Sequence, residues 1–519
     1  MAENELMAAE GVIGVIDITK KRKLRSVTYY AVIASIGSAM SGYCSGVMSG
    51  AVLFIKEDLS INEAQEEMLI GSLILVSIVG NLIAGLLADK MGRKKTLLLG
   101  AIIVMAGCSI MGIAPSYVFL FLGRLLTGIG YGFPLSIVPL YIAEVSPPES
   151  RGSLLSIPEI FVNSGILLGY VSSFCLAPLP VFINWRLMLG LGGVLGFILA
   201  CGSLVIPESP RWLVLRDRID EAFEILVNTS CNEREAELRL AQIMMAADDP
   251  PTHTDTESAE LKPEFLPKAT AILEKGGNIE ATHPLLHQKH EHKLGDAWSE
   301  LLRPNPEVRR ALLAAVGLQF FQQASGIAPI IYYLPSIFER AHFKSKVGSL
   351  GATVAVGLTK TLFISVATAF LDRSGRRPLL FISCVGMALS MATLAMGFYF
   401  LDWISASETI WSANLPGVLA LCSSCSFVAF FSVGMGPISG SLLPAELFPL
   451  RLRAQGLSLT MACNRLFSGL ISLSFLTILT MLTPAGTFFL FALISALSIP
   501  FFYLVIPETK GQILEEISA

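Results

Sequence analysis

Apolar residues occur in long runs along most of the chain, and polar residues gather between the runs. A helix that crosses a lipid bilayer needs about 20 mainly apolar residues, and each run is long enough to supply them. The pattern predicts twelve membrane helices, six on each side of a long polar stretch. The predicted helices are 27–54, 67–88, 96–114, 117–142, 153–176, 186–206, 308–336, 347–371, 378–401, 412–445, 453–480 and 484–506.

The polar stretch, 207–306, separates an N-terminal half (27–206) from a C-terminal half (308–506), with short polar ends at 1–26 and 507–519. Apolar residues recur at helical spacing over 234–247, which predicts an amphipathic helix. The residues that follow are rich in Asp, Pro, Thr, Glu and Lys and favour disorder. Four histidines within 283–292 have a spacing that can ligate a metal, but we interpret them as part of a solvated linker and predict no metal site.

Lysine and arginine collect in alternate short loops, whereas the intervening loops are short or acidic. The positive-inside rule places such basic loops on the cytosolic side, so both chain ends are expected in the cytosol. The first apolar run follows a basic cluster directly, and we expect it to stay as a membrane helix. The basic segments are 20–25, 89–95, 149–152, 372–378 and 451–453.

The composition agrees with a membrane protein, because 53% of the residues are apolar and only 15% are charged. Soluble domains carry about 25% charged residues. The nine cysteines stand mostly alone in apolar runs, and even the pair in "CSSC" (422–425) is expected to pack rather than to bind metal. No basic patch points to nucleic acid, and no phosphate-binding, zinc or nucleophile motif points to an enzyme or a cofactor.

Three loop signals occur once in each half, in the same order. "DKMGRKK" at 89 is echoed by "DRSGRRP" at 372, a glutamate stands seven residues before an arginine at 144 and again at 446, and "PES" at 207 is echoed by "PET" at 507. Such a repeat predicts an all-α membrane protein of two parallel six-helix halves that rock about a central site.

The repeated loops place arginines and carboxylates at one face of the membrane, where they can form bidentate ion pairs. We expect such pairs to hold the cytoplasmic ends of the two halves together in one state and to release them in the other. The predicted gate residues are Asp89, Arg93, Glu144, Arg151, Glu208, Asp372, Arg376, Glu446, Arg453 and Glu508.

These motifs also carry a family resemblance. The sequence resembles the sugar porter family of the major facilitator superfamily and, within it, the plant polyol and monosaccharide transporters. The first resemblance rests on "GRLLTGIGYG" (123–132), "PLYIAEVSPPESRG" (139–152), "PESPRWL" (207–213), "FQQASGI" (321–327) and "PETKG" (507–511). The second rests on "IPEIFVNSGILLGYVSSF" (157–174), "VGLTKTLF" (356–363) and "ELFPLRLRAQG" (446–456).

Charged residues inside membrane helices are rare and usually functional, and four occur here: Arg124, Glu159, Lys360 and Arg465. The resemblance places Glu159 where hexose carriers have a sugar-binding glutamine, and Lys360 where other sugar porters have an uncharged polar residue. The two either pair with each other or have separate partners. The resemblance implies that substrate is bound by Glu159, Ile166, Gln322, Gln323, Tyr333, Lys360 and Asn464.

Three positions depart from the family pattern. Cys44, within "GYCSGVMSG" (42–50), replaces an aspartate that faces Arg124 in proton-linked members. Ala328 replaces an asparagine or aspartate, and Gly440 replaces a tryptophan that stacks on the sugar. A neutral thiol cannot cycle as the aspartate does, so we expect proton coupling through this position to be weak or absent. Glu159 is then the remaining acid that could carry a proton.

The expected function is therefore secondary transport of polyols or monosaccharides by alternating access, with little proton coupling through the first helix. A non-transporting sugar sensor is one alternative, because three site positions have changed. A carrier of sugar acids or other organic anions is another, because three predicted buried cations face one acid. We expect a monomer in the plasma membrane rather than the vacuolar membrane, whose partners are a polyol or sugar, the lipid bilayer and, where coupling persists, protons.

Overall fold

The protein forms a bundle of long helices, and the part of the chain that the computed structural model describes contains no strand. Side chains are not described for 2–24, 246–248, 307, 368–374, 376, 402–407, 415 and 453–454. The described residues are 2–147, 150–230, 232–248, 304–341, 343, 345–374, 376–407, 415–439, 443, 447–448 and 452–505.

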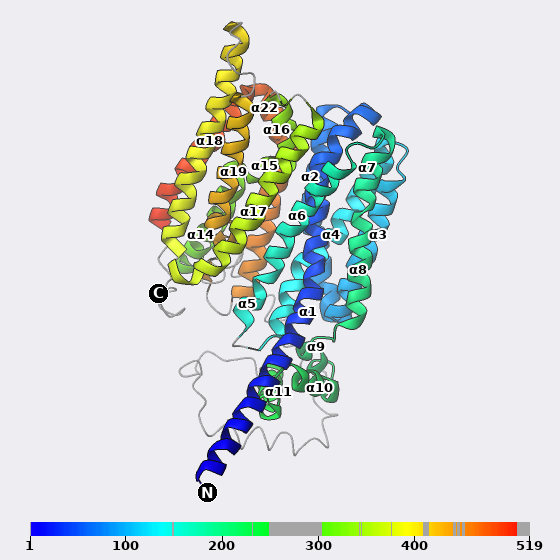
Figure 1. Ribbon diagram of the computed structural model, residues 1–519, viewed down its shortest axis with the longest axis vertical. Coiled ribbons are helices and arrows are strands. Elements are labelled where there is room, and N and C mark those ends of the chain that lie inside the picture. Colours follow the sequence, from blue (N-terminus) through cyan, green and yellow to red (C-terminus); the bar gives the residue numbers. More distant parts are fainter. Residues whose placement is uncertain are drawn as a thin grey trace.

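The N-terminal half contains six membrane segments, which lie together on one side of the bundle (Figure 1). The first helix extends beyond the predicted 27–54 at both of its ends, and the fifth and sixth segments are each divided by a short break. The helices are α1 (Ala2–Leu59), α2 (Glu63–Met91), α3 (Arg93–Gly112), α4 (Tyr117–Val145), α5 (Arg151–Leu155), α6 (Ile157–Leu176), α7 (Val181–Gly190) and α8 (Gly192–Val205).

The C-terminal half lies beside it (Figure 1). Its first segment is not the single helix predicted at 308–336, because a π turn with Gly326 at φ 95° interrupts it and the helical path continues to Arg340. The elements are α14 (Pro306–Gln322), η1 (Gln323–Ile327), α15 (Ala328–Tyr332), α16 (Leu334–Arg340), α17 (Lys346–Ser374), α18 (Arg376–Ser407), α19 (Leu415–Val433), α20 (Met435–Pro437) and α22 (Arg453–Val505).

The number of membrane crossings follows from these helices. Eleven helices among the described residues are long and apolar enough to cross a bilayer, and the last, Gln455–Val505, has 51 residues. That helix turns sharply at Thr483, which has φ 65° and precedes Pro484, so it crosses twice. The bundle therefore crosses the membrane twelve times, which confirms the predicted fold.

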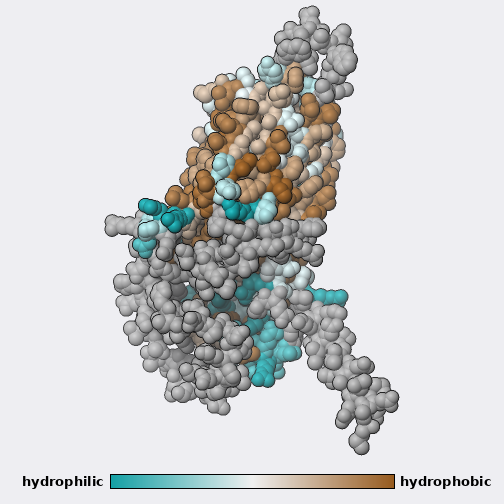
Figure 2. All heavy atoms as spheres, turned by 90° about the vertical axis from the view of Figure 1, so that its left-hand side faces the viewer, coloured by the Kyte–Doolittle hydropathy of each residue, from teal (hydrophilic) through white to brown (hydrophobic). Residues whose placement is uncertain are grey.

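Apolar side chains cover the outside of the bundle, as expected for a surface that contacts lipid (Figure 2). Leu86 on α2, Ile113 after α3 and Leu504 on α22 are 69%, 79% and 79% exposed. Hydrophilic side chains gather instead toward the end of the bundle that carries α9 (Pro210–Val214), α10 (Ile219–Thr229) and α11 (Glu233–Asp248) (Figures 1 and 2). We call this end the linker end and the opposite end the far end.

The helix predicted over 234–247 is α11, and α9 and α10 are two further helices of the stretch 207–306, where intracellular helices were expected. These three helices share a small apolar core that includes Trp212, Leu226 and Leu240. Their polar side chains reach the membrane helices, because Trp212 Nε1 donates to the carbonyl of Asp89 and Arg239 Nη2 donates to that of Val145. The Trp212 indole and the Arg239 guanidinium thus satisfy carbonyls near the ends of α2 and α4 that lack a partner within their own helix.

Inside the N-terminal half, α1 and α6 touch along their backbones. A Cβ added to Gly42 would clash with the carbonyl oxygen of Val162, and one added to Gly46 would clash with that of Ile166. Small residues at this spacing let two membrane helices approach closely. The segment "GYCSGVMSG" is thus the contact stripe of α1, and it holds Cys44 in the buried interior of the half.

Candidate transport site and gates

A cluster of amides lies in the C-terminal half, where α14 faces α22. Asn464 Nδ2 on α22 donates to Gln322 Oε1 and to Gln319 Oε1, both at 2.6 Å. Gln319 Nε2 donates in turn to the carbonyl of Ser439 at 2.7 Å. The structure therefore brings the predicted Gln322 and Asn464 together, and it adds Gln319, which sequence analysis missed. Its spacing of three residues from Gln322, which puts both on one helix face, was the available signal.

A second polar group joins the two halves near the middle of the bundle. Asn163 on α6 donates from Nδ2 to Glu159 Oε1 at 3.2 Å, while its own Oδ1 is buried without a partner. Thr361 Oγ1 on α17 donates to the carbonyl of Asn163 at 3.4 Å. The neighbouring Lys360 is 8% exposed and lies close enough to Glu159 for their charges to interact. No contact within 4.0 Å joins these two described side chains, so Glu159 has a separate partner here.

Only two of the four charged residues that were predicted to be buried in membrane helices are buried. Arg124 and Lys360 are buried, whereas Arg465 is half-buried and Glu159 is exposed. The prediction of burial was therefore wrong for Glu159. Glu159 stands in the first turn of α6, roughly 12 Å along the helical path from Arg151 at the linker end. Its side chain is exposed at this position.

Four other predicted residues lie in packed surroundings. Ile166 packs against α1, and Ala328 is 2% exposed in α15. Tyr333 is fully buried and donates to the carbonyl of Ser472 at 2.7 Å, which ties the chain after α15 to α22. Gln323 begins the π turn and is buried. Gly440 lies outside the described residues, so its predicted role stays a prediction.

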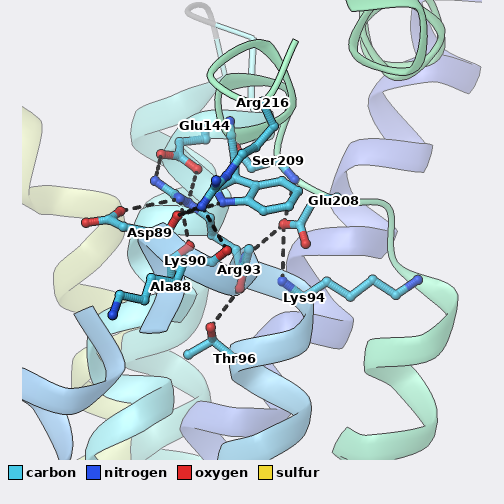
Figure 3. A network of polar contacts seen from close by, with 12 residues as sticks. Ala88, Asp89, Lys90, Arg93, Lys94, Thr96, Glu144, Glu208, Ser209 and Arg216 are labelled. Atoms are coloured by element: carbon cyan, nitrogen blue, oxygen red, sulfur yellow. Dashed lines mark hydrogen bonds and ion pairs between the residues drawn. The ribbon is translucent and has the colours of Figure 1, made fainter. Parts of the chain in front are cut away.

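The linker end holds a network of charges within the N-terminal half (Figure 3). Arg93 at the start of α3 forms a bidentate ion pair with Glu144 near the end of α4, with Nε to Oε2 at 2.9 Å and Nη2 to Oε1 at 3.0 Å. Both side chains are buried. Asp89 lies 3.5 Å from Arg93 and is 78% exposed, so it adds little.

Glu208 completes the network by capping α3. Its Oε1 accepts from the backbone N–H groups of Arg93 at 2.8 Å and Lys94 at 3.2 Å (Figure 3). These donors are the first of the helix and have no partner within it, and a carboxylate also complements the positive end of the helix dipole. The motif "PESPRWL" therefore supplies from a distance the cap that α3 lacks locally.

Gly92 is required at this junction for two reasons. Its φ is 94°, which L side chains rarely adopt, and an added Cβ would clash with Glu208 Oε2. Gly92→Ala is expected to lower the stability of the folded protein by about 1–3 kcal/mol. The measurement is thermal unfolding of the purified protein in detergent.

Gly85→Ala on α2 is the matched control, because nothing lies within 4 Å of its added Cβ. Alanine is also the better helix former, so this control is expected to keep or raise the melting temperature. Equal melting temperatures for the two variants would contradict the role assigned to Gly92.

The remaining predicted gate residues are less defined. Arg151 is exposed on α5. Asp372 is in α17, Arg376 begins α18 and Arg453 begins α22, but their side chains are not described. Glu446 and Glu508 lie outside the described residues. The pairs that are described join helices of one half, not the two halves as expected from the sequence.

The two halves are joined at the far end instead. Lys346 on α17 pairs with Glu57 on α1 at 2.5 Å, and Arg340 on α16 pairs with Glu63 on α2 at 3.4 Å. Glu67 on α2 is 5% exposed and accepts twice from Thr477 on α22. These contacts close the bundle at the far end, and sequence analysis predicted none of them.

A pocket of about 290 Å³ lies behind these contacts. It is lined by charged groups of both halves, among them Lys56, Glu66, Glu339 and Arg340. Lys56 Nζ pairs with Glu66 at 3.1 Å within the N-terminal half. Burial raises the pKa of Glu339, because the charged carboxylate loses contact with water, so this group binds a proton at a higher pH than an exposed glutamate.

Two six-helix halves, polar side chains at their junction and ion pairs that close one end define a membrane carrier of the alternating-access class. Comparison with known proteins gives the family. The model of the family "Sugar (and other) transporter" matches residues 30–261 and 261–519. The chain therefore belongs to this family of the major facilitator superfamily, as its motifs indicated. Because the family consists of transporters, the expectation that the protein is not an enzyme is confirmed.

Relatives of the chain match over nearly its whole length. The chain is 44% identical to "Polyol transporter 5" of Arabidopsis thaliana over 488 residues, which cover 94% of this chain and 84% of that protein. It is 31% identical to "Probable metabolite transport protein CsbC" of Bacillus subtilis, over 96% and 95% of the two chains. The fold matches the xylose transporter XylE from E. coli with a TM-score of 0.72 at 23% identity, over 95% and 99% of the chains.

Proposed function

We propose that the protein transports a polyol or monosaccharide across the plasma membrane by alternating access, with the linker end and both chain ends in the cytosol. The observation that carries this proposal is the amide cluster of Gln319, Gln322 and Asn464. Amides offer both donors and acceptors, which suits the hydroxyl groups of a polyol or sugar. The names of the plant relatives support the same substrate class.

The proposed cycle follows from the contacts between the halves. With the far end closed by Glu57–Lys346, Glu63–Arg340 and Glu67–Thr477, the substrate leaves toward the linker end. Rocking the halves about the central polar groups breaks these contacts and opens the far end to the outside. The Arg93–Glu144 network holds the N-terminal half rigid while it moves.

Proton coupling through the first helix is proposed to be weak, because Cys44 provides no carboxylate to pair with Arg124. Glu159 remains a candidate proton carrier, since its exposed carboxylate can exchange protons with water from the linker end. The protein is proposed to act as a monomer.

Uptake by reconstituted vesicles tests the proposal. Vesicles that contain the full chain are expected to accumulate or equilibrate labelled polyols or hexoses, with little change when a protonophore collapses a pH gradient. Uptake of no compound on a panel that also includes gluconate would refute transport and favour a sensor. Uptake of gluconate alone would favour a carrier of organic anions, and strict dependence on the pH gradient would refute weak coupling.

Asn464→Ala is expected to reduce the uptake rate at subsaturating substrate by about 10-fold or more, because it leaves Gln319 and Gln322 without their shared donor. Ser474→Ala is the matched control on the same helix, since the hydroxyl of this half-buried residue bonds to the carbonyls of Leu470 and Ile471 in its own helix. Equal uptake by the two variants, at equal amounts of folded protein, would exclude a role of the amide cluster in binding.

A further inference from the structure

Arg124 is the most deeply buried cation in the described part of the N-terminal half, with 1% of its surface exposed. Two of its nitrogens have backbone partners: Nε donates to the carbonyl of Leu69 at 3.1 Å and Nη1 to that of Cys44 at 3.0 Å. The third nitrogen, Nη2, is buried with no hydrogen-bond partner. A guanidinium stays charged in proteins, so this is a permanent positive charge with a free donor.

The groups around this charge are thiols and phenols rather than carboxylates. Those that interact with it electrostatically are the thiols of Cys44 and Cys108 and the phenols of Tyr131 and Tyr332. No described carboxylate lies within ion-pair distance of Arg124. The two sulfurs are close neighbours, because a Cβ built on Gly192 would lie 2.9 Å from Cys108 Sγ and 3.6 Å from Cys44 Sγ.

The hydrogen-bond directions favour an anion here. Tyr131 accepts from Ser45 Oγ at 3.2 Å, which leaves the phenolic proton of Tyr131 free to donate. Thiols, phenols and guanidinium N–H groups all donate, and a small anion accepts from every one of them. The backbone carbonyls of Leu69 and Cys44 contribute only dipoles, and a buried charge without a counter-charge costs several kcal/mol.

We propose that Arg124, together with the thiols of Cys44 and Cys108, forms a binding site for one small monovalent anion. The anion takes the place of the carboxylate that Cys44 lacks and neutralises Arg124. Two sources share this chemistry: a free halide such as chloride, and the carboxylate of a bound sugar acid. The proposal does not depend on the transported substrate, because it concerns the charge balance within the N-terminal half.

Thermal unfolding of the purified full chain in detergent tests this site. The protein is melted at equal ionic strength in sodium chloride, sodium gluconate and sodium methanesulfonate, the last being the reference anion because it is neither a halide nor a carboxylate. At an anion concentration 100 times the Kd, the binding anion is expected to raise the melting temperature by about 2–3 °C. A rise in chloride identifies a halide site, and a rise in gluconate identifies the carboxylate of a sugar acid.

Two substitutions at Cys44 separate anion binding from a general salt effect. Cys44→Asp supplies an internal carboxylate to Arg124, so this variant is expected to lose the anion-dependent shift. It is also expected to melt in methanesulfonate at least as high as the native protein does in the binding anion. Cys44→Ser replaces the thiol with another neutral donor and is expected to retain the shift.

Two results would overturn the site. The first is the same melting temperature for the native protein in all three salts; if Cys44→Ser is then also less stable in every salt, Cys44 is itself the counter-charge, as a thiolate. The second is an undiminished anion shift in Cys44→Asp, which would show that the ion binds elsewhere.

Discussion

Glu144→Gln is expected to leave little stably folded protein. The substitution removes one partner of a buried bidentate ion pair and leaves the Arg93 guanidinium without its buried counter-charge. Breaking a buried pair in this way costs about 3–5 kcal/mol. Native proteins are stable by only about 5–15 kcal/mol, so the loss is a large part of the total. The measurement is the yield and melting temperature of the monodisperse protein in detergent.

The control for this variant is an exposed ion pair at the start of the linker helix α10. Arg218 pairs with Glu221, and about half of each side chain is exposed. Arg218→Ala is expected to change stability by less than about 1 kcal/mol. Replacing both buried partners, as Arg93→Met with Glu144→Leu, is expected to recover part of the loss, because no buried charge is then left alone. If the Glu144→Gln protein melts at the same temperature as the Arg218→Ala protein, the stabilising role assigned to the Arg93–Glu144 pair is contradicted.

The Arg93–Glu144 pair also shows what the sequence can predict. The repeated loop motifs indicated that arginines and glutamates meet at one face of the membrane, and the structure places Arg93 against Glu144 there. Apolar run length indicated twelve crossings for a similar reason, because the bilayer sets the length of a spanning helix. Both predictions rest on short segments whose physical constraint is local.

The features that the sequence did not predict depend on which helix faces the fold brings together. Gln319 and Asn163 looked like ordinary polar residues, because Asn464, which donates to Gln319, and Thr361, which donates to the carbonyl of Asn163, come from distant helices. The break in the predicted helix 308–336 arises where Gly326 adopts a positive φ against Phe491, a contact with a helix far along the chain. Glu159 was predicted to be buried from its place in an apolar run, yet exposure depends on whether a neighbour covers that face.

The sequence also did not predict the contacts at the far end. Removing one of them is the second substitution for which we expect a large effect. Glu67→Ala is expected to weaken closure of the far end and to shift the protein toward the state that is open there. Glu67 Oε1 accepts from the backbone N–H of Thr477 and Oε2 from its hydroxyl, both at 2.9 Å, between the two halves. Hydrogen bonds to a charged group contribute about 1.5–3 kcal/mol each, so losing both changes the ratio of the two states by roughly 100-fold or more.

Labelling of the far-end pocket measures this shift. Ser336 lines the pocket, so Ser336→Cys reports its accessibility to a membrane-impermeant maleimide, with modification at this position quantified by peptide mass spectrometry. Glu66→Ala is the matched control: Glu66 is the adjacent, equally buried residue of α2, but its partner Lys56 belongs to the same half. Labelling is expected to rise strongly with Glu67→Ala and little with Glu66→Ala. Equal rates in the two variants would mean that Glu67 stabilises α2 alone, and that closure of the far end rests on other contacts.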